Sequence, residues 1–275
     1  MRTGSGTHST AERGRNRVLL QVRNLSKHFA GLVAVQDVSL EVSKGELLAI
    51  VGPNGAGKSV LFGLVSGMLK PTGGKVLFQG QEITGMRPHQ VARKGIARTF
   101  QTTALFDQLR VADNLALGYR LRTRSGFWST LLHTRSWAQD RQRAMARVVE
   151  ILEIIGLKEK VFRPVSTLSQ AEQRKLAIAV ALMGEPSLLL LDEPTGGLVE
   201  EDTREITELI RRIHQELKVT ICLIEHKMRM VMELAQRMVV LNFGSIIAEG
   251  PPRQIAQDPR VIEAYLGVDH FAETQ

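Results

Sequence analysis

The sequence contains a single cysteine and no long apolar run, and both features narrow the classes of protein to consider. Cys222 is the only cysteine among 275 residues, so a disulfide within the chain is excluded. No stretch approaches the roughly 20 apolar residues that cross a bilayer as a helix, and the polar N-terminus lacks the apolar region of a signal peptide. We therefore expect a globular protein of the cytosol, with Cys222 buried in a strand.

Positive charge is abundant, with a formal net charge of +8. This excess is compatible with a nucleic acid partner, an anionic membrane surface or a generally basic proteome, and it does not decide among them. One segment is rich in arginine, at Arg120, Arg122, Arg124, Arg135, Arg141, Arg143 and Arg147. We interpret it either as a solvated helical face or as a surface for anionic groups.

Apolar periodicity predicts a chain that begins with strands and then alternates strands with helices. Strands are expected at 18–25, 33–42, 46–51, 75–83, 187–193, 219–225 and 238–244, and helices at 61–69, 112–155, 170–183, 201–216 and 227–236. Such alternation is typical of α/β folds with a parallel sheet covered on both faces. The helical stretch in the middle interrupts the alternation and indicates an insertion.

A glycine-rich loop that fits the pattern G-x-x-x-x-G-K-[ST] follows the third predicted strand and precedes a helix. In such a loop, glycines let backbone N–H groups surround phosphate oxygens, the lysine neutralises the terminal phosphates, and the serine hydroxyl ligates Mg²⁺. The loop consists of Gly52, Pro53, Asn54, Gly55, Ala56, Gly57, Lys58 and Ser59, with Val60 next. It predicts a nucleoside triphosphate site.

Two carboxylates, Asp192 and Glu193, end the apolar run SLLLLDE. Ligands of open parallel sheets bind at the carboxyl ends of strands, so we expect both groups at the phosphate site. Asp192 suits Mg²⁺, and Glu193 suits the role of a base that accepts a proton from an attacking water. Gln101, in the stretch ARTFQTT, and His226, at the end of another predicted strand, complete the set.

With these motifs in this order, the chain resembles the nucleotide-binding subunit of an ABC transporter over about Val18 to Gly267. The matching elements are the aromatic Phe29 for adenine stacking, the Walker A loop from Gly52 to Ser59, the Q-loop Gln101, the signature LSQAEQ, the Walker B pair Asp192 and Glu193, the D-loop from Gly197 to Glu200, and the switch His226. The resemblance implies a P-loop NTPase core with a mostly parallel sheet, an N-terminal antiparallel β subdomain and an inserted helical subdomain.

The implied organisation is a disordered tail at 1–17, a single ATPase domain at 18–267 with a helical insert at about 102–183, and a C-terminal tail at 268–275. The implied cofactors are ATP and Mg²⁺. Ser59, Gln101 and Asp192 would hold the metal, and Glu193, His226 and Gln101 would serve catalysis. A site of this family is completed by the signature of a second subunit, where Ser169 and residue 171 would face the partner's γ-phosphate.

Three positions depart from the family pattern. Ala171 replaces a glycine in the signature, Val60 replaces a hydroxyl residue after Ser59, and Val199 replaces a polar D-loop residue. These departures leave open a nucleotide-binding subunit with little turnover. The resemblance implies a heterodimer, in which a second ATPase subunit supplies a normal signature to this chain. A homodimer is the alternative, and both of its sites would carry every departure.

The sequence FAGLVAVQDVSLEV, the arginine-rich insert and the ending VIEAYLG are similar to ATPases of bacterial branched-chain amino-acid and amide importers. This implies two permease subunits, a periplasmic substrate-binding protein, no nucleic acid, and a peripheral location at the cytoplasmic face of the inner membrane. Urea transport and lipid or lipopolysaccharide transport remain alternatives. An ABC ATPase acting on ribosomes or DNA is disfavoured because neither a second cassette nor a coiled coil is present, and a GTPase because Asn-Lys-x-Asp is absent.

Overall fold

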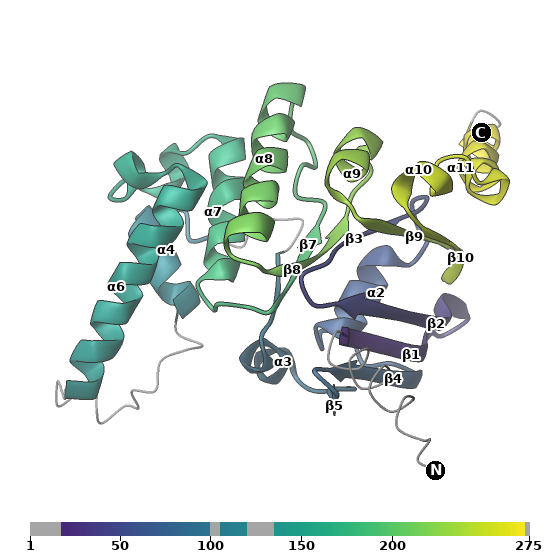
Figure 1. Ribbon diagram of the computed structural model, residues 1–275, viewed down its shortest axis with the longest axis horizontal. Helices are drawn as coiled ribbons and strands as arrows, with labels where there is room; N and C mark the ends of the chain where they lie inside the picture. The colour runs from purple at the N-terminus through teal and green to yellow at the C-terminus, as the bar shows by residue number, and fades with distance from the viewer. Residues whose placement is uncertain (1–17, 100–104, 120–134, 273–275) are drawn as a thin grey trace, which may run out of the picture. The chain divides into compact units, whose positions relative to one another are not determined.

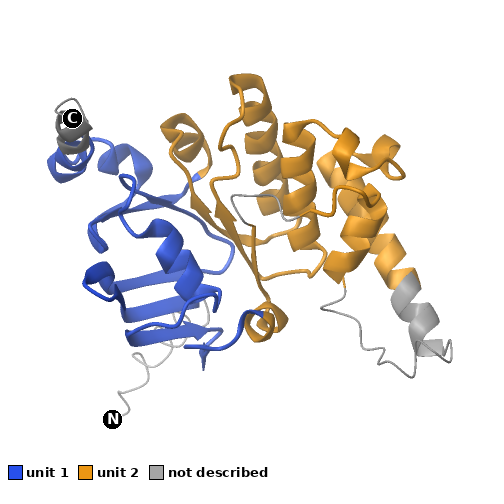
Figure 2. Cartoon of the chain, turned by 180° about the vertical axis from the view of Figure 1, so that it is seen from behind, with its two compact units in different colours: residues 1–88, 235–275 blue, residues 89–234 orange. Residues whose placement is uncertain are grey.

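The computed structural model describes residues 18–99, 105–119 and 135–272. The chain divides into two compact units, which Figure 2 shows in different colours: unit 1 contains residues 1–88 and 235–275, and unit 2 contains residues 89–234. The expected tail at 1–17 lies outside the described residues. The prediction of a single ATPase domain at 18–267 stays a prediction.

The first sheet of unit 1 is antiparallel, with the strand order β2-β1-β4-β5. Its strands are β1 (Val18–Phe29), β2 (Leu32–Ser43), β4 (Gly73–Phe78) and β5 (Gln81–Glu82). A two-residue turn at Ala30-Gly31 joins β1 to β2, and Ala30 has the positive φ of 47° that such a hairpin needs. On β2, buried apolar side chains alternate with exposed residues, so one face of this strand packs on the core.

Unit 1 also contains the run β10-β9-β3, which carries the glycine-rich loop (Figure 1). β3 (Leu47–Val51) pairs in parallel with β9 (Arg237–Asn242), and β10 (Ser245–Gly250) returns antiparallel after a turn at Phe243-Gly244. All five residues of β3 are buried, as expected for a strand of a parallel sheet. The helices of this unit are α2 (Lys58–Val65), α10 (Pro252–Ile255) and α11 (Pro259–Ala272).

Unit 2 is built on three parallel strands in the order β8-β7-β6. They are β6 (Ile96–Arg98), β7 (Leu188–Asp192) and β8 (Thr220–Ile224). β7 and β8 are buried throughout, and the side chain of Cys222 is 1% exposed, which confirms its predicted place in a buried strand. Because the strands are parallel, the residues that follow β7 and β8 emerge at the same edge.

The helices of unit 2 connect these strands and form the predicted insertion (Figure 1). They are α3 (Pro88–Lys94), α4 (Val111–Gly118), α6 (Arg135–Ile155), α7 (Gln170–Leu182), α8 (Glu200–Glu216) and α9 (Met228–Leu234), with single 3₁₀ turns at Lys158–Lys160 and Val165–Thr167. α8 is strongly amphipathic and buries Ile206, Ile210 and Ile213. Of the expected helical insert at about 102–183, the structure describes residues 105–119 and 135–183.

The α/β fold class and its antiparallel and mostly parallel sheets are confirmed, and several elements differ in extent from the sequence prediction. α2 begins at Lys58 rather than at residue 61, because the glycine-rich loop leads directly into its first turn. α3, β6, β10 and the two C-terminal helices were not predicted, since they are short or lack clear periodicity. α11 continues to Ala272, beyond the expected domain end at 267. In the part of the chain that is described, no helix has the length and apolarity to cross a membrane.

Candidate functional site

The glycine-rich loop lies between β3 and α2, and two of its glycines are required by close backbone contacts. Gly52 has φ 148°, and a Cβ added there would lie 2.0 Å from the carbonyl oxygen of Leu241. Gly57 has φ 97°, and its Cβ would lie 2.3 Å from the carbonyl oxygen of Ala34. Any side chain at either position would force the backbone apart, so these glycines fix the loop against β9 and β2.

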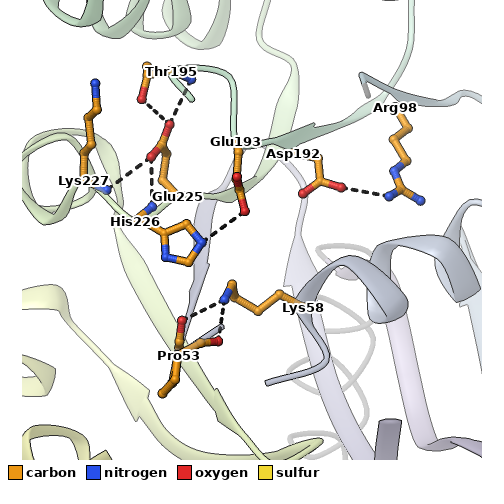
Figure 3. A network of polar contacts seen from close by, with 10 residues as sticks. Pro53, Lys58, Arg98, Asp192, Glu193, Thr195, Glu225, His226 and Lys227 are labelled. Carbon is orange, nitrogen blue, oxygen red and sulfur yellow. Dashed lines mark hydrogen bonds and ion pairs between the residues drawn. The ribbon is translucent and has the colours of Figure 1, made fainter. Parts of the chain in front are cut away.

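Lys58 begins α2 and is 5% exposed. Its Nζ donates hydrogen bonds to the carbonyl oxygens of Gly52, at 2.7 Å, and Pro53, at 2.9 Å (Figure 3). The ammonium is thereby held across the loop that surrounds it. N–H groups at the start of a helix together with an adjacent cation favour an anion, so the residues present fit the phosphates of ATP.

Tyr265 on α11 is a contact of the loop that the sequence analysis missed. The N–H of Gly52 donates a hydrogen bond to its hydroxyl oxygen; burial raises the pKa of Tyr265, although this hydrogen bond opposes the rise. The hydroxyl therefore remains protonated at neutral pH. In the sequence, the surrounding stretch VIEAYLG indicates only a family resemblance, and the local signal for this contact is a lone tyrosine on an otherwise apolar helix face.

Phe29, the predicted adenine-stacking residue, ends β1 and is 40% exposed. The Nζ atom of Lys27 lies over its ring, 4.8 Å from the centroid. This is a cation–π contact, and it places a positive charge beside the ring. An exposed aromatic surface at this strand end is compatible with the stacking role, which stays a prediction.

Asp192 ends β7 in unit 2, and its side chain is buried. Its Oδ2 accepts a hydrogen bond from Nη2 of Arg98 at 2.8 Å, and its N–H donates to Oγ1 of Thr99 at 3.4 Å. Arg98, on β6, is thus the charge partner of Asp192, a role that the sequence analysis did not assign. Carboxylate and hydroxyl oxygens are hard donors that suit Mg²⁺, and Asp192 provides the first kind and the exposed residue Ser59 the second. No cluster of three potential metal-ligating His, Cys, Asp or Glu side chains occurs among the described residues.

Glu193 follows β7 in the left-handed backbone region, with φ 48°. Its N–H donates to the carbonyl oxygen of Ile224 at 3.0 Å, which ties the turn to the end of β8. His226 lies just beyond that strand, and its Nε2 is 3.0 Å from Oε1 of Glu193 (Figure 3). Both side chains remain partly exposed, at 21% for Glu193 and 37% for His226. The structure therefore brings together two of the predicted catalytic residues.

Ser169 is the N-cap of α7, as the sequence predicts. Its Oγ accepts from the N–H of Glu172 at 3.2 Å, and Oε2 of Glu172 accepts from the N–H of Ser169 at 3.1 Å, which completes a capping box. Lys160 forms an ion pair with the same carboxylate. Burial raises the pKa of Glu172, but the hydrogen bonds from Lys160 and Ser169 and the charges of Lys160 and Lys175 outweigh it, so the pKa lies below its ordinary value.

Ala171, which is predicted to face a partner's γ-phosphate, is 3% exposed in the isolated chain, because the second position of α7 turns toward the interior of unit 2. The methyl group therefore packs within this chain, and the role of Ala171 toward a partner stays a prediction. The exposed residues of the motif are Ser169 and Gln170. The sequence pattern could not reveal this, since a capping box fixes where a helix begins but not which face is buried.

The remaining predicted site residues differ in whether the structure describes them and in how exposed they are. Gln101, predicted for catalysis and metal binding, lies outside the described residues, as do Arg120, Arg122 and Arg124 of the arginine-rich segment. Asn54 and Gly55 are exposed, Ala56 is buried, and Val60 is partly buried on α2. Val199 is 67% exposed and is the N-cap of α8, where it provides no capping hydrogen bond from its side chain.

Comparison with known proteins places these features in a family context. The model of the family described as "ABC transporter" matches residues 35–196, and the model described as "Branched-chain amino acid ATP-binding cassette transporter" matches residues 245–270. The high-affinity branched-chain amino acid transport ATP-binding protein LivG of Escherichia coli (strain K12) is 41% identical over 249 residues, which cover 90% of this chain and 98% of LivG. The corresponding protein BraF of Pseudomonas aeruginosa is 38% identical, covering 92% of this chain and 99% of BraF.

Solved structures agree with the sequence relatives. A crystal structure of the ADP conformation of an ATP-binding cassette from an ABC transporter superposes with a TM-score of 0.79. It is 30% identical in sequence, and the match covers 91% of this chain and 99% of that one. The likeness therefore extends over both compact units and over nearly all of the described chain.

Glu172 provides a test of the capping box through pH. Because its pKa is lowered in the folded state, its stabilisation is fully present above the unfolded pKa and is lost as pH falls through the folded pKa. Glu172→Gln should lower the free energy of unfolding of the purified chain by about 1 kcal/mol at pH 7. Denaturant unfolding at several pH values should show this difference narrowing below about pH 4.

Glu263→Gln is the matched control, since Glu263 is an exposed carboxylate on α11. It should change the free energy of unfolding by less than about 0.5 kcal/mol at either pH. A pH of 3.5 lies roughly one unit below an ordinary glutamate pKa. If Glu172→Gln lowered the free energy of unfolding by the same amount at pH 7 and at pH 3.5, the result would contradict a stabilising role for the ionised carboxylate.

Proposed function

The chain belongs to the ABC transporter family of ATP-binding proteins, whose members couple ATP hydrolysis to transport, and from this premise we propose that it energises import of branched-chain amino acids. Within that proposal, ATP binds at the loop of unit 1 and is hydrolysed with the side chains at the ends of β7 and β8. The observation that carries the proposed hydrolysis is the 3.0 Å contact between Glu193 Oε1 and His226 Nε2, at the edge where ligands of parallel strands bind.

In the proposed reaction, Glu193 accepts a proton from the water that attacks the γ-phosphorus of ATP. A bond forms between the water oxygen and phosphorus, the bond to the β,γ-bridging oxygen breaks, and ADP and inorganic phosphate leave. His226 donates its Nε2 hydrogen to the Glu193 carboxylate and so holds this base in one orientation. Lys58 stabilises the charge on the terminal phosphates from within the loop.

A bound Mg²⁺ would supply positive charge that neutralises the phosphates of ATP. Ser59 and Asp192 are the residues proposed to hold it, with Gln101 as a third. Arg98 orients the Asp192 carboxylate, because its Nη2 donates a hydrogen bond to Oδ2 of Asp192 at 2.8 Å. Gly52 and Gly57 keep the loop N–H groups in place, and Phe29 would stack on adenine.

The proposed assembly contains a second ATPase subunit, two permease subunits and a periplasmic substrate-binding protein, at the cytoplasmic face of the inner membrane. Exposed Ser169 at the N-terminus of α7 supports a role toward a partner's nucleotide, because N–H groups there are suited to a phosphate. The second ATPase subunit is proposed to be a different chain because the importer resemblance implies one; Val199, exposed at the N-cap of α8, is one of the departures that such a subunit would meet. Because Ala171 is buried in the isolated chain, its proposed effect on a partner's nucleotide passes through the backbone of α7.

Branched-chain amino acids are the proposed solutes because LivG and BraF carry that function in their names and the C-terminal segment matches the corresponding family model. The ATPase itself does not select the solute, so amides, urea or lipid-related transport remain the alternatives. A subunit that binds ATP with little turnover is a further alternative. Measurement of kcat for ATP hydrolysis distinguishes it from the proposal.

Substitution of Glu193 tests the chemistry. Glu193→Gln should leave ATP affinity near wild type and lower kcat for ATP hydrolysis by about 10² or more, because the amide cannot accept the proton. Lys58→Ala should instead abolish nucleotide binding. Both are measured in the assembled transporter, by equilibrium binding and by phosphate release.

The exposed carboxylate of Glu201 on α8 offers a control for the Glu-to-Gln change, and Glu201→Gln should hydrolyse ATP at the wild-type rate. Hydrolysis by Glu193→Gln at the wild-type rate would contradict the assignment of the base. A wild-type assembly that binds ATP without measurable turnover would favour the regulatory alternative.

Uptake by the reconstituted transporter tests the solute. Proteoliposomes that contain the assembly, with ATP enclosed, should accumulate labelled leucine, isoleucine and valine in the presence of the binding protein, and Glu193→Gln should reduce uptake in proportion to its ATPase rate. Labelled urea and short-chain amides serve as competitors. Accumulation of urea with no uptake of branched-chain amino acids would overturn the substrate class and leave the ATPase assignment intact.

A further inference from the structure

Three consecutive residues after β8 contact three different points of the segment 193–203. His226 contacts Glu193, as described above. Its neighbours, Glu225 and Lys227, carry charges that the hydrolytic chemistry does not use. Both reach the loop formed by residues 195–199, which connects Glu193 to α8 and is called the 195–199 loop below.

Glu225 fixes the beginning of the 195–199 loop. Its residue is 3% exposed, and its Oε1 accepts hydrogen bonds from the N–H of Thr195, at 3.0 Å, and from the Thr195 hydroxyl. Its Oε2 accepts from the N–H groups of His226, at 2.9 Å, and Lys227, at 3.2 Å (Figure 3). One buried carboxylate therefore joins the first residue of the loop to the backbone that carries the histidine.

Lys227 fixes the other end of the loop. Its Nζ donates to the carbonyl oxygen of Leu198 at 2.9 Å and to Oγ1 of Thr203 at 2.6 Å. The Thr203 hydroxyl in turn donates to the carbonyl oxygen of Val199 at 2.9 Å. The ammonium thus reaches both residues that precede α8, one of them directly and the other through the hydroxyl.

The loop needs such an anchor because its own sequence provides none at the start of α8. The N-cap of this helix is Val199, whose side chain cannot accept a hydrogen bond, and the structure gives it no side-chain cap. N-cap positions usually carry Ser, Thr, Asp or Asn, which fix the chain entering the helix. Lys227 supplies a fixed contact at this point from a different part of the chain.

We propose that Lys227 is a positioning residue for ATP hydrolysis, which holds the 195–199 loop so that Glu193 and His226 keep their mutual orientation. Glu193 occupies a left-handed conformation directly before this loop, and the N–H of Gly196 donates back to its carbonyl oxygen at 3.1 Å. A displacement of the loop would therefore be passed to Glu193 through two peptide units. Lys227 touches no reacting atom, and its effect passes through the carboxylate of Glu193.

The inference rests on the proposed function and makes a separate kinetic prediction. Lys227→Met keeps an unbranched apolar chain and removes the ammonium. In the assembled transporter it should lower kcat about tenfold while the KM for ATP changes by less than about twofold, because the catalytic orientation is lost and the phosphate loop in unit 1 is untouched. Lys227→Arg retains donors for Leu198 and Thr203, and should restore kcat to within about threefold of wild type.

Arg229→Met is the matched control. Arg229 lies two residues after Lys227, and its side chain is 76% exposed. It contacts the side chain of Glu200 at 3.1 Å, and in that contact it donates to no carbonyl oxygen of the 195–199 loop. The Arg229→Met variant should hydrolyse ATP with wild-type kcat and KM. An equal loss in Arg229→Met and Lys227→Met would contradict the proposal, because a general change of charge near α9 would then explain both.

Combination with Glu193→Gln separates this inference from the proposed function. If Lys227 acts through Glu193, adding Lys227→Met to Glu193→Gln should cause little further loss of kcat. Wild-type kcat in Lys227→Met, alongside a large loss in Glu193→Gln, would overturn the inference and leave the proposed function standing. Wild-type kcat in Glu193→Gln would overturn the proposed function itself. A full, multiplicative loss in the double variant would also contradict action through Glu193.

Discussion

The left-handed turn at Glu193 is the constraint on which the proposed chemistry depends. A residue other than glycine in this backbone region costs on the order of 1 kcal/mol and persists only where its surroundings enforce it. Here the enforcement comes from the N–H of Glu193 bonding to the end of β8, and from Glu225 bonding to Thr195. The turn separates the directions of Asp192 and Glu193, so that one carboxylate pairs with Arg98 and the next contacts His226.

Buried charges in this protein are paired within short segments that also carry function. Lys58 is held by the carbonyl oxygens of its own loop, Asp192 by Arg98, and Glu225 by four hydrogen-bond donors. Breaking one partner of such an arrangement leaves a desolvated charge, so these contacts fix geometry strongly. Contacts within each unit therefore hold that unit's functional side chains in place before any nucleotide binds.

Sequence reasoning identified the residues whose chemistry is local and missed those whose role depends on a distant partner. The phosphate loop, the carboxylates after β7 and the Ser169 capping box each follow from spacing over a few residues, and the structure contains all three local arrangements. Arg98, Tyr265 and Lys227 contact groups that are 24 to 213 positions away in the sequence, a separation that periodicity does not encode. The burial of Ala171 was missed for the same reason, since it depends on which face of α7 the rest of unit 2 covers.

Glu193 and His226 act as one catalytic unit in the proposed reaction, and a double-mutant cycle measures their coupling. In this cycle, kcat for ATP hydrolysis is measured for the wild-type assembly, Glu193→Gln, His226→Gln and the double variant. The double variant should be about as slow as Glu193→Gln alone, because the histidine works by orienting that carboxylate. Losses that multiply, so that each substitution has its full effect in the presence of the other, would show that the two residues have independent roles and would contradict a single catalytic unit.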